Sequence, residues 1–120
     1  PSYNKINGFY TSQNPGLLTT IARDEWGFDG LYVTDFDGKG SAAAKVRAGS
    51  DILMSGNIQE HNELKIALKD KTLDESILDK NLLHILKFKL NSPRAKGHIP
   101  TSKPDLNVHA KTAQKAAEEG

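Results

Sequence analysis

Residues 27–38, GFDGLYVTDFDG, place a carboxylate directly after a short apolar run. The aromatic and β-branched residues between Gly30 and Asp35 predict a short buried strand, bounded on both sides by turn residues. Asp35 then stands at the carboxyl end of this strand, with Phe36 beside it. Ligands bind at the carboxyl ends of the strands in parallel α/β sheets and barrels. The stretch therefore predicts a site rather than a simple turn.

Helical and extended segments alternate on both sides of this strand. A helix is expected over residues 15–27, with Asn14 as its N-cap and a proline at its first position. After the strand, Ser41 can cap a short helix over residues 42–48, and residues 50–56 predict a second strand. This order is typical of βα units in a parallel sheet or barrel, so the fold class is α/β.

Two longer helices are expected in the second half of the chain. The first covers residues 58–69. Thr72 and Glu75 match the capping box T-x-x-E and so predict the start of the next helix, which ends at Ser92. Its apolar residues recur at helical spacing: Leu78, Leu82, Ile85, Leu86 and Leu90.

The end of the chain differs in composition from the rest. Residues 93–105 contain three prolines and few apolar side chains, which predicts an extended linker. Residues 106–120 predict a helix whose apolar stripe is mostly alanine. Such a stripe buries little area alone and needs another surface to pack against.

The composition restricts the classes of function. The chain has 120 residues, of which 37% are hydrophobic and 26% charged, with a formal net charge of +1. This balance gives no nucleic-acid footprint, and no apolar run approaches the roughly 20 residues that span a bilayer. The absence of cysteine excludes disulfides and zinc–thiolate sites, and it leaves the cellular compartment open.

The predicted strands raise a problem of coverage. Two parallel strands leave both edges of a sheet open, and such edges must be paired or covered. Both strands are apolar on both faces, as strands buried from two sides are. A complete barrel of this type needs about 250 residues. We therefore expect this chain to be one part of a larger α/β domain.

From local sequence alone, Asp35 has two interpretations. It can be a nucleophile, a general base or a metal ligand, or it can stabilise the following loop through an Asx-turn. Phe36 can stack on the apolar face of a ligand or belong to the core. Both alternatives stay open at this point.

The other polar residues that stand near glycines or strands are less specific. Asp29 and Asp37 are expected to be turn residues, and Asp51 a turn or helix-facing group. The GKGS run at residues 38–41 lacks the spacing of a phosphate-binding loop. The four histidines show no metal-ligand spacing and are expected at the surface or in packing: His61, His84, His98 and His109. No metal site is expected.

Several motifs together resemble one enzyme family. SYNKING (2–8), SQNPGLLTTIARDEWGFDGLYVTDF (12–36) and AGSDILMSG (48–56) resemble family 3 glycoside hydrolases of the β-glucosidase type. The run LNSPRAKGHIPTSKPDLNVHAKTAQKAAEEG (90–120) is similar to the connection between the first and second domains of that family. The match extends along essentially the whole chain, in order.

The resemblance implies a domain organisation. Residues 1–92 would form the C-terminal portion of a (β/α)8 TIM-like catalytic barrel, from the end of strand six to helix eight. Residues 93–105 would be the interdomain linker, and residues 106–120 the first helix of an α/β sandwich domain.

The resemblance also implies roles for three residues. Asp35 falls on the catalytic nucleophile, and Tyr3 on a tyrosine that contacts the nucleophile and the sugar. Phe36 falls where the family usually has a tryptophan wall of the sugar site, so its stacking surface is smaller. Ser55 replaces the proline of the family's M-P-G, which changes a loop rather than the chemistry.

The implied activity is a retaining β-glucosidase, which hydrolyses terminal non-reducing β-D-glucosyl residues without a metal or organic cofactor. No residue here matches the family's acid/base, so other chains would have to supply it together with the rest of the barrel. The alternatives are a non-catalytic fragment that binds carbohydrate or partner chains, and a family 3 enzyme of other specificity, such as a β-xylosidase.

Overall fold

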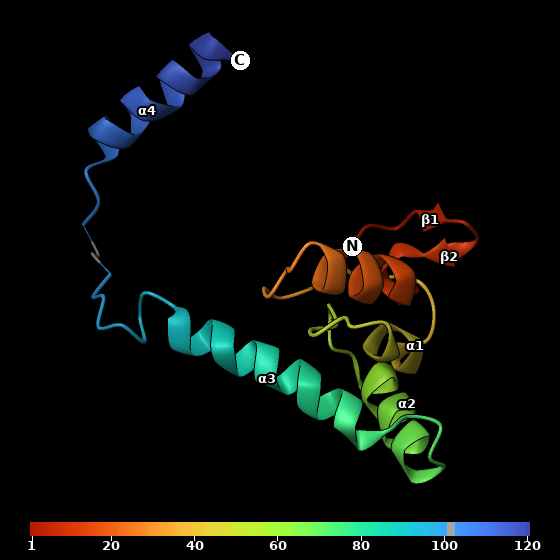
Figure 1. The fold of residues 1–120 in the computed structure, drawn as a ribbon. Coiled ribbons are helices and arrows are strands. Elements are labelled where there is room, and N and C mark those ends of the chain that lie inside the picture. Colours follow the sequence, from red (N-terminus) through yellow and green to blue (C-terminus); the bar gives the residue numbers. More distant parts are fainter. Residues whose placement is uncertain (101–102) are drawn as a thin grey trace.

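The computed structural model describes residues 1–100 and 103–120, which form a mainly helical chain (Figure 1). Its elements follow one another in this order: β1 (Lys5–Ile6), β2 (Phe9–Tyr10), the 3₁₀ turn η1 (Thr11–Gln13), the helix η2 (Gly16–Glu25), α1 (Ala42–Arg47), α2 (Ile58–Lys69), α3 (Glu75–Asn91) and α4 (Leu106–Glu119).

The N-terminal strands form a tight hairpin. β1 and β2 are antiparallel, with Lys5 opposite Tyr10 and Ile6 opposite Phe9. The two residues between them, Asn7 and Gly8, have φ angles of 50° and 85°. Asn-Gly is the dipeptide that best tolerates two successive left-handed residues, which the two-residue hairpin turn requires.

The predicted helix after Asn14 is present but is wider than an α-helix. The Asn14 side chain accepts a hydrogen bond from the Leu17 N–H at 3.1 Å, so the expected N-cap is confirmed. The helix η2 is a π-helix, and at its end the Trp26 N–H bonds the Ile21 carbonyl five residues back. Gly27, at φ 69°, ends it as predicted. The apolar spacing of the sequence does not distinguish this winding from the ordinary one.

The two predicted strands lie parallel but form only one bridge, between Val33 and Ile52. The Thr34 N–H donates to the Ile52 carbonyl at 2.9 Å, and the Ile52 N–H donates to the Tyr32 carbonyl at 3.1 Å. The prediction that both strands are buried is wrong for this chain, because Val33 is 39% exposed. Two isolated strands lack neighbours that would cover their faces.

The short helices after these strands begin where the sequence predicts. The Ser41 hydroxyl accepts from the Ala44 N–H at the start of α1, and the Asn57 side chain accepts from the Glu60 N–H at the start of α2. Side-chain acceptors of this kind satisfy amide groups that have no partner within the first helical turn.

The predicted capping box at the start of α3 is wrong. The N-cap is Asp74, which accepts from the Ser76 N–H at 2.8 Å. Thr72 belongs to the preceding turn, where its hydroxyl bonds Asp70 at 2.7 Å. The Leu73 N–H bonds the Ala67 carbonyl and so extends the end of α2 beyond Thr72. Thr72 and Asp74 are both suitable cap residues, and Asp74 is the cap because the turn after α2 uses the Thr72 hydroxyl.

The core lies where α1, α2 and α3 meet, and it is small (Figure 1). Its buried apolar residues are Ala43, Val46, Ala67 and Leu73, with Leu53, Leu64, Leu68, Ile77 and Leu78 packed against them. Polar groups complete it. The Lys45 ammonium, 1% exposed, pairs with Glu60 at 2.7 Å, and the buried Asn81 amide donates to the carbonyls of Val46 and Ser50.

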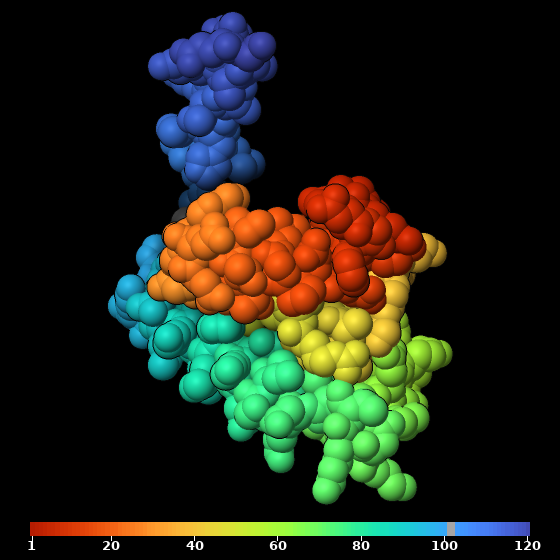
Figure 2. Space-filling view, turned by 45° about the vertical axis from the view of Figure 1, so that its right-hand side comes forward, coloured from red at the N-terminus to blue at the C-terminus, as the bar shows by residue number. Residues whose placement is uncertain are grey.

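The C-terminal helix α4 stands away from the other helices (Figures 1 and 2). Asp105 caps it by accepting from the amides of Asn107 and Val108, and all of its residues are exposed. The linker is not extended throughout, since residues 93–97 form turns in which the His98 N–H bonds the Pro93 carbonyl. Residues 101 and 102 of the predicted linker lie outside the described residues.

Glu63 of α2 joins two helices and should make the stability of the chain depend on pH. Its carboxylate accepts from the Ser41 hydroxyl at 2.5 Å and from the amides of Ala42 and Ala43. Desolvation raises its pKa, but these hydrogen bonds and the Lys45 charge outweigh it and lower the pKa below 4.5. The stabilisation is therefore present above the unfolded pKa and is lost as pH falls through the folded one.

We predict that Glu63→Gln lowers the free energy of unfolding at neutral pH by about 1–2 kcal/mol, toward the lower end of the ~1.5–3 kcal/mol that hydrogen bonds to a charged group contribute, because the side chain is only partly buried. The difference should shrink as the pH falls through the lowered pKa of the folded state, because the wild-type carboxylate then becomes protonated. Thermal unfolding followed by circular dichroism measures both effects. Glu25→Gln, at an exposed position of η2, serves as the control. A constant difference at all pH values would contradict the assignment.

Candidate active site

Asp35 lies directly after the parallel bridge, at the carboxyl end of its segment. Its Oδ1 accepts a hydrogen bond from the Phe36 N–H at 2.8 Å, and its carbonyl accepts from the Gly38 N–H, which closes a turn. The preceding Thr34 is buried, and its hydroxyl accepts from the Met54 N–H at 2.9 Å. The position of Asp35 is thus held from both sides, while its side chain remains exposed.

Tyr3 reaches this turn from the opposite end of the sequence. Its hydroxyl donates to the Phe36 carbonyl at 2.6 Å, across 33 positions of the chain. The pKa of Tyr3 is raised above 10.0 by partial desolvation, by hydrogen bonding and charge from Asp35, and by the charge of Asp37. The hydroxyl has one proton, which the geometry assigns to the Phe36 carbonyl.

Phe36 follows Asp35 directly, and its side chain is exposed to solvent rather than buried in the core. It is 59% exposed, and Tyr3 is 52% exposed. The structure therefore brings the three residues singled out in the sequence, Tyr3, Asp35 and Phe36, to one surface. A carboxylate on the same surface as two exposed aromatic side chains suits a ligand that has both an electrophilic carbon and an apolar face.

A second loop is fastened to this turn. Asp37 has φ 49°, as a turn residue does, and its carboxylate accepts from the Ser55 hydroxyl at 2.9 Å. The family pattern has proline where Ser55 stands. A proline could not make this bond, so the departure gives this chain a loop-to-loop contact next to Asp35.

Sequence analysis missed a buried polar cluster behind the site, formed by Arg23, Asp51 and His84. The Asp51 side chain is fully buried. Its Oδ2 accepts from Arg23 Nη2 and from the Tyr32 N–H, both at 2.8 Å, and its Oδ1 contacts His84 Nδ1 at 2.7 Å. Asp51 does face a helix, as predicted, but its partners were not foreseen.

Arg23 also binds the backbone of the segment that leads to Asp35. Its Nη1 donates to the carbonyls of Phe28 and Gly30, at 3.3 and 3.2 Å. Its guanidinium lies 4.7 Å from the centre of the Tyr32 ring. Desolvation is the main reason that the pKa of Tyr32 is raised, with Asp51 raising it further and Arg23 opposing the change. The sequence offered one signal for this ion pair: Arg23 is a charged residue inside the predicted helix, and Asp51 is a carboxylate 28 positions later.

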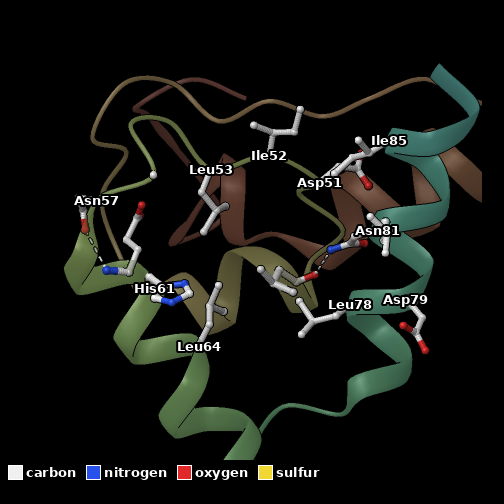
Figure 3. Close-up of a pocket in the computed structure, with 14 residues that line it drawn as sticks. Asp51, Ile52, Leu53, Asn57, His61, Leu64, Leu78, Asp79, Asn81 and Ile85 are labelled. Carbon is white, nitrogen blue, oxygen red and sulfur yellow. Dashed lines mark hydrogen bonds between the residues drawn. The ribbon is translucent and has the colours of Figure 1, made fainter. Parts of the chain in front are cut away.

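A cavity of about 500 Å³ opens between α2 and α3 (Figure 3). The apolar side chains of Ile52, Leu53 and Leu78 line it, together with others of both helices. Neither Asp35 nor the two rings beside it contribute to its lining. Its chemistry is that of an unfilled packing surface, so the candidate active site is the Asp35 turn and not this cavity.

Among residues 1–100 and 103–120, no three His, Cys, Asp or Glu side chains are grouped so that they could hold a metal ion. In the same part of the chain, no helix has the length and apolar character needed to cross a membrane.

No family model matches the chain, but individual proteins do. A β-glucosidase of Rhizobium radiobacter is 48% identical over 66 residues, which are 55% of this chain and 8% of that protein. A probable β-glucosidase J of Emericella nidulans is 40% identical over 95 residues, 78% of this chain and 11% of that protein. An exo-α-(1→6)-L-arabinopyranosidase of Bifidobacterium longum is 32% identical over 116 residues, 97% of this chain and 15% of that protein.

Solved structures agree with these relatives. β-Glucosidase 3B of Thermotoga neapolitana, in complex with glycerol, superposes with a TM-score of 0.87 at 38% identity, over 98% of this chain and 18% of that one. A family 3 β-glucosidase of Bifidobacterium adolescentis superposes with a TM-score of 0.83 at 29% identity, over 97% of this chain and 17% of that one.

These matches define a class of protein, the glycoside hydrolases. Within that class, the chain is similar to a segment of the family 3 enzymes of the β-glucosidase type, as the sequence motifs predict. The chain spans between 8% and 15% of the length of the curated relatives named above.

The proximity of Tyr3 and Asp35 can be tested without any activity. We predict that Asp35→Asn lowers the pKa of Tyr3, because the variant removes the negative charge that disfavours the tyrosinate. The ultraviolet absorbance of tyrosinate, titrated with and without Tyr3→Phe, isolates this one residue. Asp29→Asn, which is not among the groups that shift the Tyr3 pKa, should leave it unchanged. An unaltered pKa in Asp35→Asn would refute the contact.

Proposed function

We propose that this chain supplies the nucleophile of a retaining family 3 β-glucosidase, which hydrolyses terminal non-reducing β-D-glucosyl residues. One observation carries the proposal: Tyr3, Asp35 and Phe36 meet at the carboxyl end of a parallel pair, within a segment that superposes on a β-glucosidase with a TM-score of 0.87. The chain covers a small part of its relatives, so the activity belongs to the chain together with the remaining segments.

The proposed reaction has two displacements. The Asp35 carboxylate attacks the anomeric carbon, so the bond from that carbon to the leaving oxygen breaks as the bond to an Asp35 oxygen forms. A second carboxyl, about 5–5.5 Å away, gives its proton to the leaving oxygen and then takes one from the water that releases the sugar. Each displacement inverts the anomeric centre, and the configuration is retained overall.

The residues of this chain hold and complement the nucleophile. The Phe36 N–H bond to Oδ1 limits the rotation of the Asp35 side chain, and the Tyr3 hydroxyl fixes the turn through the Phe36 carbonyl. In the proposed complex the Phe36 ring covers one face of the pyranose. The acid/base is not assigned to any residue of this chain and would come from the other segments, and no metal or organic cofactor takes part.

We further propose the domain division that the motifs imply. Residues 1–92 would form the last part of a TIM-like barrel, residues 93–105 the linker, and residues 106–120 the beginning of an α/β sandwich domain. The parallel bridge, the exposed Val33 and the open cavity between α2 and α3 support this proposal. In the proposed barrel, neighbouring strands would pair with the open edges beside this bridge, and neighbouring strands and helices would cover Val33 and the cavity.

For the identity of the sugar, a specific alternative exists. The arabinopyranosidase of Bifidobacterium longum matches 97% of this chain, so the segment itself is compatible with more than one pyranoside. Phe36, smaller than the tryptophan of the family pattern, lies where such selectivity would be expressed. Assays should therefore include an aryl arabinopyranoside beside the aryl β-glucoside.

The nucleophile is tested in the completed enzyme, with the remaining segments fused or added as separate chains. We predict that Asp35→Asn lowers kcat for aryl β-glucoside hydrolysis on the order of 10⁴-fold or more, because removal of a nucleophile removes the covalent route. Release of the aryl alcohol measures the rate.

Asp37→Asn is the matched control for this test. Asp37 is an exposed carboxylate in the same turn and bonds Ser55, so its loss should leave most of the rate. Equal rates for wild type and Asp35→Asn would eliminate the assigned nucleophile. A completed protein that binds glucosides but hydrolyses none would favour the non-catalytic alternative.

A further inference from the structure

The segment that carries Asp35 has little regular structure to hold it. From Gly30 to Phe36 it forms one parallel bridge, to Ile52. A nucleophile must be held within about half an ångström of its productive position. The restraint must therefore come from side chains, and the cluster of Arg23, Asp51 and His84 is the place where they converge.

Arg23 fixes the beginning of the segment. Its guanidinium bonds the carbonyls of Phe28 and Gly30 with one nitrogen and the Asp51 carboxylate with another. This planar fork sets two backbone oxygens and one side chain in a common geometry, which a lysine could not reproduce. The entry of the segment is thereby tied to η2.

Asp51 fixes the middle of the segment. Its side chain accepts from the Tyr32 N–H at 2.8 Å, and its own N–H donates to the Tyr32 carbonyl at 3.0 Å. One residue thus binds both polar groups of the Tyr32 backbone. This sets the register between the two extended segments, and with it the residue that emerges at their end.

His84 ties the same carboxylate to α3. His84 Nδ1 lies 2.7 Å from Asp51 Oδ1, and the carboxylate accepts a hydrogen bond there when Nδ1 carries the hydrogen. The imidazole is 23% exposed, while the carboxylate is fully buried. The helix that packs behind the site therefore shares an anchor with the segment in front of it.

From this cluster the restraint passes along the chain to the site. Two residues beyond Tyr32, Thr34 bonds Ile52 through its amide and Met54 through its hydroxyl. Asp35 follows immediately, and its direction is determined by where Thr34 leaves the bridge. We infer that Arg23, Asp51 and His84 are positioning residues that aim Asp35 at the reacting carbon, an inference that rests on the proposed function.

The test distinguishes a role of the cluster in positioning Asp35 from a role in stability alone. The completed enzyme is labelled with a 2-fluoro-glucoside that forms a slowly hydrolysed bond to the nucleophile, and the binding constant and the labelling rate are measured separately. We expect Asp51→Asn to slow labelling by about 10–100-fold per folded molecule with little change in probe binding, since small displacements of a reacting group cost rate in this way. Thermal unfolding gives the folded fraction.

A second buried ion pair provides the matched control. Lys45 and Glu60 also pair at 2.7 Å, but they join α1 to α2 and make no bond to residues 28–36. Glu60→Gln should lower the melting temperature without slowing labelling per folded molecule. If both variants leave the labelling rate unchanged, or both slow it in proportion to lost stability, the positioning role is overturned.

Milder changes keep the test informative if Asp51→Asn does not fold. His84→Gln retains a donor and should label at close to the wild-type rate, whereas His84→Ala should label more slowly. Equal rates for these two variants would contradict the inference.

The two proposals fail in different ways. If mass spectrometry of the wild type finds the label on another residue, or finds none, the proposed function fails whatever the variants do. Positioning is then judged from the Phe36 amide resonance, which should shift in Asp51→Asn or His84→Ala and not in Glu60→Gln. An unshifted resonance would overturn it.

Discussion

A single buried anion, the Asp51 carboxylate, determines the geometry of this chain. Its side chain is completely withdrawn from solvent, and it is bonded by Arg23, by His84 and by a backbone amide. An unpaired charge in such a place would be very unfavourable, so its donors must be present together or not at all. Because they come from η2, from the extended segment and from α3, these three elements can close in few other ways. The two extended segments share one bridge, so the pairing of Asp51, rather than a sheet, fixes how these elements are arranged.

The apolar core alone would not impose that order. The buried residues at the meeting point of the helices are small, mainly alanine and valine, while Val33, Leu82 and Leu86 stay exposed. Full burial of one such side chain contributes about 1.5–3 kcal/mol. The uncovered surface therefore represents a large driving force for association with further segments. Two parallel strands with open edges and an open cavity between helices have the same physical meaning, since each lacks the neighbour that would cover it.

Local chemistry was readable from the sequence, and contacts between distant residues were not. Asn14 and Ser41 cap their helices as predicted, because a short polar side chain can bond the first free amides within its own turn. Thr72 met the same local criterion, but its prediction as a cap was wrong, because its hydroxyl bonds Asp70 in the turn after α2. The strand-end position singled out Asp35 with Phe36 beside it, whereas Tyr3 and the three roles came from motif resemblance, which carries tertiary information that spacing lacks. Arg23, Asp51 and His84 are separated by 28 and 33 positions, and no local rule joins them. They meet only because the tertiary structure brings η2, the extended segment and α3 together around the buried Asp51 carboxylate.

In the proposed enzyme, the division of roles between this chain and the other segments follows from the same contacts. Everything that directs the Asp35 backbone lies within residues 1–92: the polar cluster, the Thr34 bonds and the Tyr3 hydroxyl. A retaining glycosidase also needs a proton donor about 5 Å from the nucleophile, and in the proposed enzyme that donor belongs to other segments. The distance between the two carboxyl groups is then set where those segments meet the open edge of residues 50–56 and the apolar side of α2 and α3. The precision of the reaction would then depend on how well that apolar surface is filled, although none of its residues is among those proposed to contact the substrate.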